Sequence, residues 1–128
     1  MKLIRLAALT LAVTMVITGC SQEKYTAHPG AINTFDSQAY DWCLVTKTII
    51  DESKKDIADG IWAANISDAV KTVLNNGLIP AYNVMDTEYQ AYHKAVTNDP
   101  NASPVKLNKA IRNVSIQTTM LQSAKGGK

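Results

Sequence analysis

From residue 36 onward, apolar residues recur every three or four positions in three long segments, and turn-forming residues separate these segments. This spacing places the apolar side chains along one side of an α-helix. No segment alternates apolar and polar residues as a half-buried strand does. The pattern therefore predicts an all-α protein: a small antiparallel bundle of three main helices, formed by residues 36–128.

The first predicted helix begins at Asp36 or Ser37, since both residue types cap helix N-termini, and ends near Asp59, before Gly60. Its apolar residues form one stripe along the helix. The stripe consists of Ala39, Trp42, Cys43, Ile49, Ile50 and Ile57.

The middle predicted helix spans residues 67–96, although Gly77 and Pro80 would normally interrupt a helix. Its apolar stripe continues through this interruption at steps of three and four residues, whereas a loop would lose that register. We therefore expect one long helix that is kinked near Pro80, because proline lacks an N–H and its ring clashes with the preceding turn. Two helices separated at Gly77 are the alternative. The stripe consists of Val70, Leu74, Leu78, Tyr82, Met85, Tyr89, Tyr92 and Val96.

The last predicted helix runs from residue 104 to about residue 124. Ser103 is its expected N-cap and Pro104 its expected first residue, a position that proline favours. The residues 97–102 before it are rich in turn formers and predict a reversal of the chain. The apolar stripe of this helix consists of Leu107, Ile111, Val114, Thr118 and Leu121.

The first 20 residues have a different pattern. Two basic residues, Lys2 and Arg5, precede an apolar run over residues 6–17, which is shorter than the roughly 20 residues of a membrane-spanning helix. The run ends in Ile17-Thr18-Gly19-Cys20. This segment resembles the lipobox of bacterial lipoproteins, in which an aliphatic residue and two small residues precede an acylated cysteine. An ordinary secretory signal and a retained transmembrane anchor are the alternatives.

The resemblance implies cleavage between Gly19 and Cys20, a signal peptide over residues 1–19, and a flexible tether over residues 20–35 that follows the lipid-bearing Cys20. It also implies a protein that is anchored to a membrane and faces the periplasm. In a Gram-negative envelope, Ser21 favours the outer membrane, because an aspartate at this position marks retention in the inner membrane. Of the chain, residues 20–128 hold 11 basic and 11 acidic residues, so this part has no net charge. These charges are interspersed along the sequence, and we therefore expect no basic patch and no nucleic-acid partner.

Residues that carry chemistry are few. His28 and His93 are too distant in sequence to suggest a zinc site, and no nucleophile or phosphate-binding motif occurs. We therefore expect no catalytic residue, metal or cofactor. His93 directly follows Tyr92 and is interpreted as a residue beside the core that pairs with a neighbour. Cys43 is interpreted as a small buried hydrophobic residue, with an intermolecular disulfide as the alternative.

Tyr82, Tyr89 and Tyr92 share one face of the middle helix. They are interpreted as residues that pack against the other helices, and alternatively as a groove for an apolar ligand or a partner helix. The sequence thus predicts a lipid-anchored cell-envelope protein with a non-catalytic role, either structural or in contact with an envelope protein partner. The alternative function is a binding module that uses the tyrosine face.

Overall fold

A computed structural model describes residues 30–126, and all helices within this range belong to one bundle. The helices are α2 (Thr34–Ala58), α3 (Ala64–Val73), the π-helical turn η1 (Leu74–Leu78), α4 (Ile79–Asn98) and α5 (Val105–Ala124). No strand occurs in this part of the chain, so the predicted all-α class is confirmed. The predicted signal peptide, Gly19, Cys20 and most of the predicted tether lie outside the described residues.

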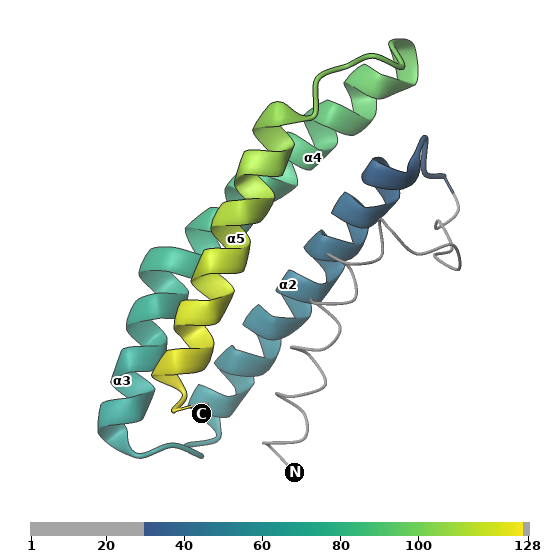
Figure 1. The fold of residues 1–128 in the computed structure, drawn as a ribbon. Coiled ribbons are helices and arrows are strands. Elements are labelled where there is room, and N and C mark those ends of the chain that lie inside the picture. Colours follow the sequence, from purple (N-terminus) through teal and green to yellow (C-terminus); the bar gives the residue numbers. More distant parts are fainter. Residues whose placement is uncertain (1–29, 127–128) are drawn as a thin grey trace.

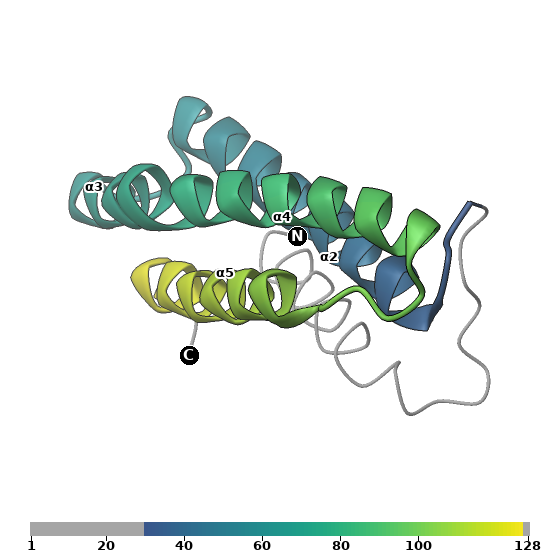
Figure 2. The same ribbon diagram turned by 90° about the horizontal axis from the view of Figure 1, so that it is seen from above.

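The bundle consists of three rods, because α3, η1 and α4 follow one another without a break (Figure 1). Figures 1 and 2 show α5 lying along the α3–α4 rod, and α2 packs mainly against α4 and also against α5. α2 and α5 run in one direction and the α3–α4 rod runs in the opposite direction. The start of α2, the end of α4 and the start of α5 therefore lie at the same end of the bundle.

The middle helix is one long helix with a π-helical turn directly before Pro80. The Ile79 N–H donates to the carbonyl of Leu74, five residues back, which widens the turn. This wider turn occurs where Pro80 has no N–H to offer and its ring needs space. Leu74 and Leu78 on the two sides of Gly77 are both buried. The predicted continuation of one helix through Gly77 is confirmed, and the alternative of two helices separated at Gly77 is wrong. The π-helical turn is compatible with the predicted kink near Pro80.

The predicted N-cap of the first helix was wrong by three to four residues. The N-cap is Asn33 rather than Asp36 or Ser37, because the Asn33 side-chain oxygen accepts a hydrogen bond from the Asp36 N–H at 2.8 Å. The bundle therefore includes Thr34 and Phe35, which the sequence assigned to the tether. Pro104 is the N-cap residue of α5 rather than its first helical residue, while the Ser103 hydroxyl accepts from the Val105 N–H at 3.3 Å.

The core lies between the three rods and consists largely of the predicted stripes. Every predicted residue of the α5 stripe is buried, and so are most of those on the other two helices. The exceptions are half-buried residues at the margin of the core, namely Ile57, Tyr82 and Tyr89. Among the described helices, none combines the length and the apolar composition needed to cross a membrane.

Candidate functional site

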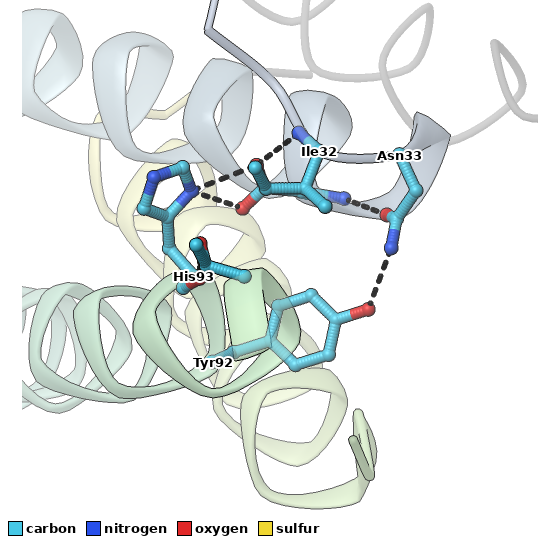
Figure 3. A network of polar contacts seen from close by, with 6 residues as sticks. Ile32, Asn33, Tyr92 and His93 are labelled. Atoms are coloured by element: carbon cyan, nitrogen blue, oxygen red, sulfur yellow. Dashed lines mark hydrogen bonds and ion pairs between the residues drawn. The ribbon is translucent and has the colours of Figure 1, made fainter. Parts of the chain in front are cut away.

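Polar side chains meet where the first turn of α2 lies beside the last turns of α4 (Figure 3). Asn33 and Asp36 come from the start of α2, and Tyr92 and His93 come from α4. We call these four residues the α2–α4 polar network. They are brought together because α2 and the α3–α4 rod are antiparallel, so that residues 57 to 59 positions apart become neighbours.

The centre of the network is the carboxylate of Asp36, which is 0% exposed. Its two oxygens lie 2.8 and 3.0 Å from Nδ1 of His93, and one of them also accepts a hydrogen bond from the Ile32 N–H at 2.9 Å. A buried carboxylate is costly unless such partners replace its water shell. The His93 side chain is 38% exposed, so the pair extends from the interior to the surface.

Asn33 connects the helix cap to the same network. Its side-chain oxygen accepts from the Asp36 N–H, and its side-chain NH₂ donates to the Tyr92 hydroxyl at 3.2 Å. The ring of Tyr92 meets the ring of Phe35 edge to face, with centroids 5.3 Å apart. An N-cap residue usually forms hydrogen bonds only with backbone N–H groups of its own helix, as in the capping box. Here the cap also fastens α2 to α4.

The three tyrosines of the predicted face do not have equal environments. Tyr92 is buried, which confirms its interpretation as a packing residue. Tyr89 is half-buried, with its ring centroid 6.1 Å from that of Tyr40 and 5.9 Å from that of His93. Burial, followed by the nearby charge of Asp36, raises the pKa of Tyr89 to about 12.

Tyr82 lies about two turns before Tyr89 and is also half-buried. Burial and then the charge of Asp86 raise the pKa of the Tyr82 hydroxyl. The phenols of Tyr82 and Tyr89 therefore stay protonated at neutral pH and can act as hydrogen-bond donors. Use of the three tyrosines by an apolar ligand or a partner helix stays a prediction.

Cys43 is buried, as predicted for a small hydrophobic residue. Desolvation, followed by the charge of Asp86, raises the pKa of its thiol from 9.0 to about 12. The reactive form of cysteine is the thiolate, so this environment suppresses nucleophilic chemistry at Cys43.

The network has one feature that catalytic sites also use, since a carboxylate orients an imidazole through Nδ1. That arrangement needs a nucleophile within reach of Nε2, and no hydrogen bond joins Nε2 of His93 to any residue in the range 30–126. Within the same range, no group of three or more His, Cys, Asp or Glu side chains is arranged to hold a metal ion. The geometry supports positioning of α2 against α4.

Sequence reasoning gave His93 a pairing role without identifying Asp36 as the partner, and it missed Asn33 altogether. The signal that was available is the spacing Asn33-Thr34-Phe35-Asp36, which matches an N-cap followed by an acidic residue three positions later. Comparison with known proteins found no matching family model, curated protein or solved structure. The site is therefore interpreted from its own residues.

Proposed function

We propose that this protein is a lipid-anchored component of the bacterial cell envelope, with a non-catalytic role in structure or protein interaction. The observation that carries the proposal is the apolar run of residues 6–17 followed directly by Ile17-Thr18-Gly19-Cys20. A short apolar segment after a basic start, ending in small residues before a cysteine, is suited to removal at residue 19 and acylation of Cys20.

The position of the bundle in the chain is compatible with this anchor. α2 begins at Thr34, so the 13 residues numbered 21–33 separate Cys20 from the first helix. Such a segment spans at most about 45 Å when it is fully extended. That length is sufficient for a helical bundle to contact either the membrane surface or a protein beside it.

The contacts made by the α2–α4 polar network support a non-catalytic role. The buried carboxylate of Asp36 contacts the Ile32 N–H and His93 Nδ1, and the neighbouring Asn33 caps α2. These contacts join two helices at the end of the bundle from which the chain leads to Cys20. A rigid attachment of that kind suits a protein that presents a surface to a partner.

The experiment that tests the anchor is intact-mass spectrometry of the protein extracted from bacterial membranes, with Cys20→Ser as the control variant. We expect a chain that begins at Cys20 and carries acyl chains, and we expect the variant to lack them. A native protein of unmodified mass would contradict the anchor. Crosslinking of the acylated protein in intact envelopes would then test for a protein partner.

A further inference from the structure

The neutral balance of residues 20–128 conceals an uneven distribution of charge, which corrects the expectation of interspersed charges. Residues 100–128 contain five basic residues and no acidic residue, whereas residues 20–99 contain six basic and 11 acidic residues. The described part of this basic segment is mainly α5. The bundle thus combines one positively charged helix, α5, with two negatively charged rods, which are α2 and the α3–α4 rod.

Five residues of α5 lie on the side opposite its buried stripe, at steps of four, three, four and four residues. We call this set the outer α5 face: Val105, Lys109, Arg112, Ile116 and Met120. All five side chains are exposed, and the apolar ones are unusually so, at 67% for Val105, 58% for Ile116 and 49% for Met120. α5 therefore has a second stripe that no described element covers.

The cations of the outer α5 face are available to an external partner. Neither Lys109 nor Arg112 forms an ion pair with another residue in the described part of the chain. The two exposed ion pairs of α2, in contrast, join a lysine of that helix to an aspartate four residues later, in the helix or at its C-cap. Cations interleaved with exposed apolar residues on one helix face are typical of helices that lie in the interface of an anionic bilayer.

We propose that the outer α5 face docks onto the anionic lipid surface of the membrane that holds the acyl chains of Cys20. The proposal rests on the anchor described under the proposed function. Charge complementarity favours this occupant, because anionic headgroups meet Lys109 and Arg112 while the apolar side chains enter the boundary with the acyl region. A nucleic acid would leave Val105, Ile116 and Met120 without apolar contacts.

The position of α5 in the fold also suits contact with the membrane. α5 begins at the end of the bundle where α2 starts, so the chain from Cys20 joins the bundle at the same end as the N-terminus of α5 (Figure 1). The helix has 20 residues, which corresponds to a length of about 30 Å. With the anchor at one end, the bundle can lie along the membrane on this helix.

The test uses the membrane-extracted protein reconstituted into vesicles of phosphatidylcholine alone or of phosphatidylcholine with phosphatidylglycerol. A fluorophore is attached to Ser123→Cys, one turn after Met120 on the same side of α5, and in a separate protein to Val84→Cys on α4. Cys43 is buried and so does not compete for the label. Quenching by acrylamide, a neutral solute, reports the exposure of each label to water.

We expect quenching at position 123 to fall at least two-fold when anionic lipid is present, and quenching at position 84 to stay the same. Each cation near an anionic surface contributes about 1 kcal/mol, which changes the ratio of membrane-docked to undocked bundles about five-fold. Lys109→Gln combined with Arg112→Gln should therefore lower this ratio about 30-fold and restore the quenching at position 123. The matched control is Lys71→Gln with Lys94→Gln, which removes two exposed cations from the middle rod and should leave the protection intact.

Three results would overturn the docking proposal. The first is equal quenching at position 123 in both kinds of vesicle, and the second is protection that depends on protein concentration, as contact with a second copy would cause. The third is a control variant that loses as much protection at position 123 as the variant without Lys109 and Arg112. Whether the protein is acylated is determined separately, from the intact mass of the protein in the same preparation. A protein without acyl chains that still shows protection at position 123 would contradict the anchor alone. An acylated protein without that protection would contradict the docking alone.

Discussion

Removal of the Asp36 carboxylate is the perturbation that tests the α2–α4 polar network most directly. In Asp36→Ala, the Ile32 N–H and His93 Nδ1 both lose their partner, and the first turn of α2 loses its acidic residue. The variant His93→Ala leaves the carboxylate buried with a single backbone donor. Asp36 is 0% exposed, so in the folded protein these contacts take the place of water around its carboxylate.

The expected magnitude follows from the contacts. A hydrogen bond to a charged group contributes about 1.5–3 kcal/mol, and breaking a buried pair costs about 3–5 kcal/mol. We therefore expect Asp36→Ala to lower the free energy of unfolding by about 3–4 kcal/mol. We expect His93→Ala to lower it by about 2–3 kcal/mol. The double variant should lose less than the sum of the single variants, with a coupling energy of about 1–3 kcal/mol.

The assay is urea unfolding of each variant, followed by far-ultraviolet circular dichroism. The matched control is Asp51→Ala, because Asp51 also lies in α2 and pairs with one basic side chain, Lys47, at 3.0 Å, but is 57% exposed. An exposed pair at this spacing contributes about 0.5 kcal/mol or less. Equal losses for Asp36→Ala and Asp51→Ala, or strictly additive effects of Asp36→Ala and His93→Ala, would refute the role of the network.

Other predictions concern the core and the π-helical turn. Leu78→Ala, at a residue with 0% exposure, should lower the free energy of unfolding by about 3 kcal/mol in the same urea assay, whereas Val84→Ala, at 53% exposure, should change it by less than about 0.5 kcal/mol. Cys43 should resist thiol reagents at pH 8 until urea unfolds the chain, and rapid modification of the folded protein would contradict its burial. Folding raises the pKa of Cys43 from 9.0 to about 12, so the protonated thiol favours the folded state. Its contribution to the free energy of unfolding is complete below pH 9 and is lost as the pH rises through 12. Cys43→Ala should reduce this loss of stability at high pH. Gly77→Ala should gain about 1 kcal/mol, because the added Cβ meets only the far end of the Gln117 side chain, which can turn away, and a loss of stability that Gln117→Ala abolishes would contradict this reasoning.

The helices could be predicted from the sequence because their signal is local. Apolar residues at steps of three and four residues identify the buried side of each helix without knowledge of its partners. The same register predicted that the middle helix would continue through Gly77 and Pro80, and the structure has a π-helical turn there instead of a loop. The kind of distortion was not predictable, because it depends on how the backbone relaxes around the proline ring.

The polar network could not be predicted in the same way. Asp36 and His93 are 57 positions apart, and their meeting depends on how far α2 is shifted along α4. Periodicity within each helix does not fix that shift. Asn33 was missed for a different reason: Asp36 and Ser37 also suit an N-cap and lie closer to the apolar stripe. An asparagine three residues before an aspartate was a local signal that could have identified it.

If the protein is anchored as proposed, any pull from the membrane enters the bundle through the first turn of α2. Helix ends usually fray, and each residue that leaves a helix would lengthen the connection to Cys20 by about 2 Å. Here Asn33 is bonded to Tyr92 and Asp36 is bonded to His93, so the first turn cannot unwind without breaking two contacts with α4. The network would thus fix the length of the connection, while the outer α5 face, which starts at the same end, would fix the orientation of the bundle. The two proposals therefore predict that Asp36→Ala weakens the protection at position 123 in anionic vesicles, although Asp36 does not belong to the outer α5 face.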